Sequence, residues 1–351
     1  MFIEKGNSYP PSNKNSKGVY KLSMGGEKMS KEDFQLKEYV QIDGHQHGMI
    51  IEGQNKENPV VLFLHGGPGF PAYPMIKASG LEWTKYVTVC YWDQRGAGMS
   101  FNSKTQGPLT VERYIKDTLA ITEYVKEKLN KEKIYLMGHS WGSFLGSLVA
   151  SKYPEHYSAY IGTGQLGRFK ESNQETIQFL LDTAITRGDQ KAAKMIGDID
   201  FDENFYVNRD YQKVLSRYLM KYGGGMKRKN YSMSKALKEV FRCKPYTWKE
   251  KFNIPRGSLL SYQAVGETLA KTDLAKRTPR FEIPVYILQG AYDYQTTCNE
   301  AKRFYENIEA PDKQFFLFED CAHTPFIEDQ KRFMDILINR ILVGPSVVVG
   351  S

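Results

Sequence analysis

A short, wholly apolar segment that ends in glycines constrains the fold of this chain more than any other feature. Val60–Leu64 reads VVLFL, and the glycine-rich stretch HGGPG follows at once at residues 65–69. A run with no polar position is typical of a strand buried on both faces of a parallel sheet. Further runs that are mostly apolar, and that we also read as strands, occupy residues 87–92, 133–137, 157–163, 284–290 and 314–318. A sheet built from such strands needs helices on both faces.

Helical patterns alternate with these runs. Residues 111–129 place apolar side chains three or four positions apart, and Thr110 precedes them as a plausible N-cap. Helices are also predicted at residues 141–153, which Pro154 closes, at 299–308 and at 325–342. Near the N-terminus, residues 39–43 and 49–51 predict a hairpin around Asp43-Gly44. The expected fold class is therefore α/β, a mostly parallel, doubly wound sheet.

The periodicity changes at about Leu166, where about 115 residues of mainly helical pattern interrupt the alternation. We expect a polar N-terminal tail at residues 1–35, a core at 36–165 and 281–343, and a C-terminal tail at 344–351. Residues 166–280 then form a helical cap inserted after the sixth core strand. Such a cap would lie over the carboxyl ends of the strands, where open α/β sheets bind ligands.

The positive charge of the chain is confined to the predicted cap. The whole chain carries +8, while residues 166–280 hold 23 Lys and Arg against 13 Asp and Glu. No zinc-finger, RNP or recognition-helix pattern accompanies this charge, so we expect no nucleic-acid partner. The basic cluster at 227–229 follows three glycines and predicts either a solvated loop or a region that attracts acidic substrates or surfaces.

Composition also bears on where the protein works. No apolar run approaches the ~18 residues of a membrane span, so no membrane partner is expected. The first thirty residues lack the apolar segment of a secretory signal. The four cysteines, Cys90, Cys243, Cys298 and Cys321, are irregularly spaced, which favours neither a disulfide framework nor a metal site. We therefore expect a soluble, cytoplasmic protein with no metal and no cofactor.

The sequence GHSWG at residues 138–142 matches the pattern G-x-S-x-G. In that pattern a sharp strand-to-helix turn exposes a serine hydroxyl, here that of Ser140. The pattern is weak alone, but an apolar strand ends at Met137 and an amphipathic helix starts at Trp141. Ser140 is therefore the predicted nucleophile.

A serine hydroxyl needs a base, and the base needs an orienting carboxylate. In the chain order that this turn implies, both follow later strands. Asp293 follows the predicted strand that ends at Gly290, and His323 follows the one that ends at Phe318. Glu319 and Asp320 remain alternative partners for His323. The predicted catalytic residues are Ser140, Asp293 and His323.

Acyl transfer also needs donors for the developing oxyanion. The HGGPG stretch follows a buried strand, so its amides are expected to point into the site. We predict that the N–H groups of Gly67 and Trp141 form the oxyanion hole. His65 is expected to brace the glycine loop, and Arg95 to pair with a carboxylate behind the site.

Together, HGGPG at 65–69, DQRGAGMS at 93–100, GHSWGS at 138–143, GAYDYQT around Asp293 and CAHTPF around His323 resemble the proline iminopeptidase group of α/β-hydrolases. The resemblance covers residues of about 55–165 and 281–343. It implies an α/β-hydrolase fold and a serine hydrolase with a helical cap. In that group, cap carboxylates hold the substrate amine. The cap carboxylates available here include Glu171, Glu175, Glu203, Glu239, Glu250 and Glu267, and the sequence ranks none of them.

The expected function is a serine hydrolase that acts through an acyl-enzyme, foremost an aminopeptidase on small peptides. An esterase or lactonase on small or acidic substrates is the alternative, which the basic cap would suit. A non-catalytic ligand receptor on the same scaffold is a further alternative. The sequence predicts a small-molecule or short-peptide partner, and it leaves the substrate-binding residues and the oligomeric state open.

Overall fold

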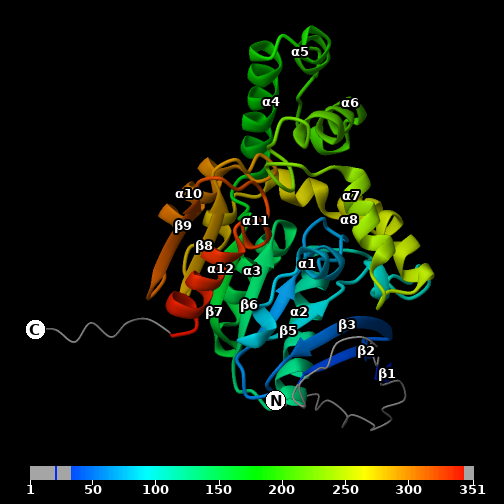
Figure 1. The fold of residues 1–351 in the computed structure, drawn as a ribbon, viewed down its shortest axis with the longest axis vertical. Coiled ribbons are helices and arrows are strands. Elements are labelled where there is room, and N and C mark those ends of the chain that lie inside the picture. The colour runs from blue at the N-terminus through cyan, green and yellow to red at the C-terminus, as the bar shows by residue number, and fades with distance from the viewer. Residues whose placement is uncertain (1–19, 22–32, 344–351) are drawn as a thin grey trace, which may run out of the picture.

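The computed structural model describes residues 20–21 and 33–343. Within these residues nine strands form one sheet in the order β1-β2-β3-β5-β4-β6-β7-β8-β9 (Figure 1). The strands β1 to β3 and the β3–β5 pair are antiparallel, and every pair from β5 to β9 is parallel. The strands are β1 (Tyr20–Lys21), β2 (Phe34–Ile42), β3 (His45–Gly53), β4 (Val60–Leu64), β5 (Thr88–Trp92), β6 (Ile134–His139), β7 (Tyr157–Thr163), β8 (Val285–Gly290) and β9 (Lys313–Phe318). The predicted mostly parallel sheet is confirmed.

The predicted hairpin is longer than its sequence pattern indicated. β2 and β3 pair over nine positions, from Phe34 opposite Gly53 to Ile42 opposite His45. Asp43 and Gly44 between them have φ of 48° and 74°, the left-handed backbone that two-residue hairpin turns require. β1 falls inside the predicted N-terminal tail and pairs with β2. The rest of residues 1–32 and the predicted tail at 344–351 lie outside the described residues.

Helices cover both faces of the sheet, as alternate side chains of β4 show. Leu62 and Leu64 pack in one buried cluster with α2, α3 and α10, whereas Val61 and Phe63 pack in another with α1 and α12. The core helices are α1 (Tyr73–Ser79), α2 (Val111–Leu129), α3 (Trp141–Lys152), α10 (Cys298–Asn307), α11 (Pro325–Glu328) and α12 (Gln330–Ile336). The N-cap at Thr110 is also present, because its side chain accepts a hydrogen bond from Arg113 N–H.

The C-terminal helix differs from the prediction of one helix over residues 325–342. Helix α11 ends at Glu328, and Asp329 adopts φ −127° and ψ 71° before α12 begins. The Asp329 side chain accepts a hydrogen bond from Arg332 N–H and so caps the second helix. A π-helical turn, Leu337–Ile341, follows α12. The apolar periodicity continues across the break, which is why it predicted a single helix.

Between β7 and β8 the chain forms a group of helices, called the cap below, which occupies the upper and right-hand part of Figure 1. Its helices are α4 (Phe169–Thr186), α5 (Gln190–Gly197), α6 (Arg209–Val214), α7 (Met233–Arg242), α8 (Trp248–Lys271) and α9 (Leu274–Arg277), with a π-helical turn at Leu215–Leu219. None of the helices in the described part of the chain combines the length and apolar composition that a bilayer crossing needs.

Helix α8 joins the cap to the core through close backbone contact. A Cβ placed on Gly257 would lie 1.9 Å from the carbonyl oxygen of Gly96, so only glycine permits this approach. Asn253 donates a hydrogen bond to the carbonyl oxygen of Gly98, and Glu250 forms a 2.7 Å ion pair with Lys37 of β2. These contacts fix the cap over one end of the sheet.

Candidate active site

Ser140 lies at the sharp turn between β6 and α3. Its backbone has φ 57° and ψ −122°, a strained conformation for a residue with a side chain. The turn is held by hydrogen bonds from Ser140 N–H to the Thr163 carbonyl and from Ser143 N–H to the Ser140 carbonyl. This backbone directs the side chain away from the sheet, as the G-x-S-x-G pattern predicts.

The two glycines of this turn are required by packing. A Cβ on Gly138 would lie 2.2 Å from the carbonyl oxygen of Gly142, and one on Gly142 would lie 2.0 Å from the carbonyl oxygen of Leu64. Both distances are far below contact, so larger residues would force α3 away from β4 and β6. The glycines therefore allow the close strand–helix approach that exposes Ser140.

Asp293 and His323 meet at the carboxyl ends of β8 and β9. His323 Nδ1 lies 2.8 Å from Asp293 Oδ2, and both side chains are almost fully buried. Because a carboxylate can only accept, Nδ1 is the donor in this hydrogen bond, which in a neutral ring leaves the lone pair on Nε2. The alternative partner Asp320 is exposed and pairs with Arg228. The structure thus brings together the predicted pair.

Four further donors hold the Asp293 carboxylate, and the sequence did not reveal them. Oδ1 accepts hydrogen bonds from the backbone N–H groups of Gln295 and Thr296. Oδ2 accepts from the Gln289 amide and the Thr296 hydroxyl, both at 2.9 Å. Gln289 also accepts a hydrogen bond from Gln165 N–H, which ties the carboxylate to the end of β7. This network fixes the plane of the carboxylate that faces His323.

His139, which precedes Ser140, supports His323 from the other side. Its Nε2 donates a 3.0 Å hydrogen bond to the His323 carbonyl oxygen, and the two rings lie 4.5 Å apart. Burial, with the nearby His323, holds the pKa of His139 well below its ordinary value, so this ring stays neutral. Gly164 packs on the opposite side, since a Cβ there would lie 2.8 Å from His323 Cε1.

The HGGPG loop lies against Ser140. A Cβ on Gly66 would lie 3.0 Å from the Ser140 Cβ. His65 braces this loop as expected, because its Nδ1 donates to the Gly66 carbonyl and its Nε2 accepts from Gln94 N–H. Burial lowers the pKa of His65 to about 4, which keeps the ring neutral in this bridging role. Gln94 also accepts a hydrogen bond from the Trp141 indole N–H at 2.8 Å.

The loop after β5 is locked behind this site. Arg95 makes a two-pronged contact with Asp117 of α2, with N–O distances of 2.5 and 2.8 Å, as the expected carboxylate pair. Asp93 accepts hydrogen bonds from Met99 N–H and from the Tyr246 hydroxyl of the cap. Burial raises the pKa of Asp93 to about 7. These residues support the loop and do not line the Ser140 cavities.

Two cavities open beside Ser140. The larger, of about 340 Å³, also contacts His323, Gly67 and cap residues of α6, α7 and α8. The smaller, of about 140 Å³, contains Gly67 and Trp141 beside Ser140. Among the described residues that line these two cavities, none is an aspartate or glutamate. The polar side chains contributed by the cap are those of Asn173, Gln212, Ser216, Tyr231, Ser258 and Tyr262.

The cap carboxylates considered from the sequence lie elsewhere. Glu171, Glu203, Glu250 and Glu267 form ion pairs with Arg168, Lys170, Lys37 and Lys271 respectively. Glu175 accepts a hydrogen bond from Asn299. Glu239 does not line the larger cavity either, but it accepts a 2.6 Å hydrogen bond from Tyr231, which does.

Comparison with known proteins decides the family. Residues 59–330 match the family model described as alpha/beta hydrolase fold. This chain belongs to the α/β-hydrolase fold family. The expected fold class and the resemblance stated from the motifs are both confirmed.

Named relatives are similar over most of their length. The "Probable aminopeptidase YbaC" of Bacillus subtilis is 27% identical over 313 residues, which cover 88% of this chain and 96% of that protein. A proline iminopeptidase of Clostridioides difficile is 26% identical over 312 residues, and the match covers 85% of this chain and 95% of that protein. The crystal structure of a proline iminopeptidase from Mycobacterium smegmatis superposes with a TM-score of 0.62 at 18% identity, covering 86% of this chain and 96% of that one, and so shares the fold.

Proposed function

We propose that this α/β-hydrolase is a serine hydrolase that acts through an acyl-enzyme, with Ser140 as nucleophile, His323 as base and Asp293 as the orienting carboxylate. The observation that carries the proposal is the 2.8 Å contact between His323 Nδ1 and Asp293 Oδ2, because His323 lines the same cavity as Ser140. With its Nδ1 proton held by the carboxylate, the ring offers Nε2 as a proton acceptor.

In the proposed reaction Ser140 Oγ attacks the substrate carbonyl carbon while His323 Nε2 takes the hydroxyl proton. The resulting imidazolium is stabilised by Asp293 and returns that proton to the leaving group. A water molecule then attacks the acyl-enzyme, and His323 again takes and returns the proton. Acid is released and Ser140 is regenerated.

We assign the oxyanion hole to the N–H groups of Gly67 and Trp141. Trp141 is the first residue of α3, and helical N–H groups in the first turn have no intrahelical acceptor. Gly67 lines both cavities with Ser140. Two such donors would stabilise the negative oxygen of the tetrahedral intermediate, where each is typically worth ~10²–10³ in rate.

For the substrate we propose small peptides with a free N-terminus. The names of the relatives from B. subtilis and C. difficile support an aminopeptidase. In this chain the amine would meet neutral oxygen acceptors, such as those of Gln212, Gln295 and Tyr231, because these polar side chains line the larger cavity.

The lining of the cavities favours a second candidate, an esterase or lactonase. A cationic amine is best held by a carboxylate, and none lines either cavity within the described residues. Leu215, Leu219, Met220 and Met226 make much of the larger cavity apolar, which suits an uncharged acyl group.

Labelling and turnover separate the candidates. A fluorophosphonate probe should label the wild-type protein and leave Ser140→Ala unlabelled, whereas a non-catalytic receptor would remain unlabelled in both forms. Hydrolysis of prolyl and alanyl naphthylamides should then be compared with that of short acyl esters. Turnover of the esters alone would replace the peptidase assignment by the second candidate.

A further inference from the structure

The helices α7 and α8 expose several large apolar side chains on the protein surface. Three side chains on α8, Trp248, Phe252 and Leu259, are 64%, 63% and 59% exposed. They are spaced four and seven positions apart and so share one face of the helix. The opposite face of α8, with Ile254 and Val265, is buried against the protein. This helix is therefore apolar on its outer side as well as on its inner side.

Helix α7 extends this surface. Leu237 and Phe241 are exposed to 44% and 37%, and Phe241 contacts both α8 aromatic rings, with centroid distances of 6.1 Å to Trp248 and 5.9 Å to Phe252. We call these five residues, Leu237, Phe241, Trp248, Phe252 and Leu259, the aromatic face. Large contiguous apolar patches on a protein surface mark interaction sites. The two helices reach the right-hand edge of the molecule in Figure 1.

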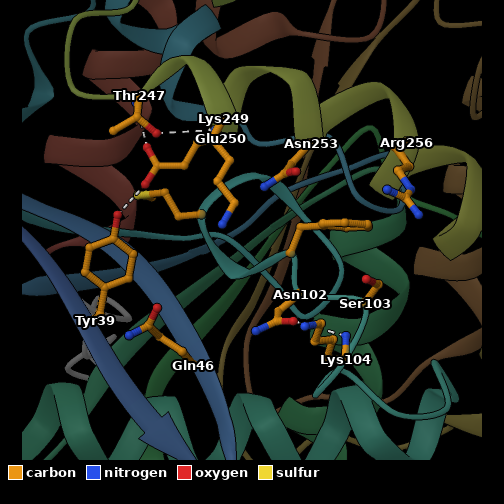
Figure 2. A pocket seen from close by; sticks show the side chains of 12 residues that line it. Tyr39, Gln46, Asn102, Ser103, Lys104, Thr247, Lys249, Glu250, Asn253 and Arg256 are labelled. Carbon is orange, nitrogen blue, oxygen red and sulfur yellow. Dashed lines mark hydrogen bonds between the residues drawn. The ribbon is translucent and has the colours of Figure 1, made fainter.

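Cationic cavities flank the aromatic face on two sides. A cavity of about 520 Å³ along α7 has five cations in its lining: Lys77 of α1 and Lys235, Lys238, Arg242 and Lys244. A second, of about 590 Å³ along α8, is lined by Lys104, Lys249 and Arg256. Figure 2 shows the latter, with Lys249 and Arg256 on the helix above and Lys104 on the loop below.

The carboxylates in these two cavities are engaged by other groups. Glu250 is held by Lys37 and Tyr39, and Figure 2 shows its contacts with Tyr39 and Thr247. Glu239 accepts from the Tyr231 hydroxyl. Eight cations against these two carboxylates give the surface around the aromatic face a positive field, and six of the eight belong to the basic excess at residues 166–280.

We propose that the aromatic face docks on the surface of an anionic lipid bilayer. Trp and Phe side chains insert at the boundary between head groups and acyl chains, and lysines beside them are attracted to anionic head groups. Six of the eight cations that line the two cavities are lysines. Protein–protein interfaces are depleted in lysine, and a second copy of this chain would bring the same positive charge, so charge favours the lipid surface. The proposal revises the expectation of no membrane partner and needs no spanning segment.

The four tryptophans make this docking measurable at one residue. Trp83, Trp92 and Trp141 are buried, whereas Trp248 is exposed. Adding vesicles made of equal parts phosphatidylcholine and phosphatidylglycerol to the full chain should shift the Trp248 emission to shorter wavelength. Phosphatidylcholine vesicles alone should give no shift, and salt should weaken the effect. Trp248→Phe should still bind the anionic vesicles, measured by flotation, without the emission shift.

Paired variants test the contribution of the apolar rings and that of the flanking cations separately. Trp248→Ser combined with Phe252→Ser should abolish flotation with anionic vesicles, while Tyr86→Ser, an exposed ring on the core, should leave it unchanged. Lys238→Glu combined with Arg242→Glu should weaken binding by at least about fivefold per cation. Lys191→Glu combined with Lys194→Glu on α5 makes the same charge change away from the face and should have a much smaller effect. Thermal unfolding of each variant verifies that it folds.

Three results would overturn the proposal. The first is that the wild-type chain does not bind anionic vesicles at low salt. The second is that the chain binds neutral vesicles as strongly as anionic ones, or that the two double charge variants lose the same amount of vesicle binding. The third is that the chain binds no vesicles but self-associates in sedimentation experiments, and that Trp248→Ser abolishes this self-association. That result would assign the aromatic face to contact with a second copy of the chain. None of these measurements depends on the proposed chemistry at Ser140.

Discussion

His323 Nδ1 lies 2.8 Å from Asp293 Oδ2, although thirty positions of sequence separate the two residues. Replacing Asp293 by Asn would put an amide where the carboxylate accepts from Nδ1, so the ring would lose its orientation and its counter-charge. We expect kcat to fall by about 10⁴-fold with little change in KM. Steady-state turnover of the best naphthylamide or ester substrate measures this.

The control for that variant is Asp320→Asn, which changes a carboxylate three positions from His323 in sequence. Asp320 is exposed and pairs with Arg228, so its loss should leave kcat within about twofold. Equal losses in the two variants would contradict the assignment of Asp293 as the orienting residue.

The buried pair of Arg95 and Asp117 should matter for stability. Asp117→Asn removes one partner and leaves the guanidinium buried without its charge complement. We expect the free energy of unfolding to fall by about 3–5 kcal/mol, measured by urea denaturation. Asp198→Asn breaks an exposed pair with Lys194 and should cost less than about 1 kcal/mol. A small effect in both variants would mean that the buried pair adds no net stability.

Gly257 should be intolerant of a side chain. In Gly257→Ala the new Cβ would lie 1.9 Å from the Gly96 carbonyl oxygen, so α8 would have to move away from the core. We expect a loss of at least about 1–3 kcal/mol in unfolding free energy. Gly197→Ala on α5 meets no atom within 4 Å and should be neutral or stabilising by about 0.5–1 kcal/mol. If Gly257→Ala unfolds at the wild-type denaturant concentration, the cap is not held by this contact.

Asp93 should make stability fall as pH rises. Burial raises its pKa from 3.8 to about 7, so between these values the folded state binds more protons than the unfolded state. Unfolding free energy therefore decreases with pH over this window, by about 4 kcal/mol at most. Asp93→Asn removes this trend.

The measurement is the difference in unfolding free energy between Asp93→Asn and wild type, from about pH 4 to pH 8. At low pH the wild type pays no cost for ionising the buried Asp93, so the variant should be the less stable of the two. As pH rises, the wild type loses stability through this ionisation and the variant does not, so the difference should shrink. The other titrating groups cancel in this difference. Asp335→Asn, at an exposed site, should show no such trend. A constant difference across the range would contradict the raised pKa.

The strands were predictable because their signal is local. Val60–Leu64 is apolar at every position, and only burial on both faces of a sheet accommodates that composition. Boundaries were less predictable. The break at Asp329 depends on one side chain that caps α12, and the apolar periodicity runs across it unchanged.

At the candidate site, sequence order and strand ends sufficed to name Ser140, Asp293 and His323. The residues that hold Asp293 in place did not stand out, because Gln289 and Thr296 are ordinary polar residues until the fold brings them to the carboxylate. The ranking of the cap glutamates likewise needed the structure, which shows Glu250 bound to Lys37 some two hundred positions away.

The order of apolar runs and glycine turns by itself predicted the α/β sheet, and it also supplied the proposed cap boundaries and the three candidate residues at the strand ends. These are properties of short segments, each set by its own composition. Tertiary structure alone decided that none of the cap glutamates considered lines the cavities beside Ser140, and which apolar residues of α7 and α8 remain exposed. A helical pattern states only that apolar side chains share a face, whereas contact with another part of the chain decides whether that face is covered.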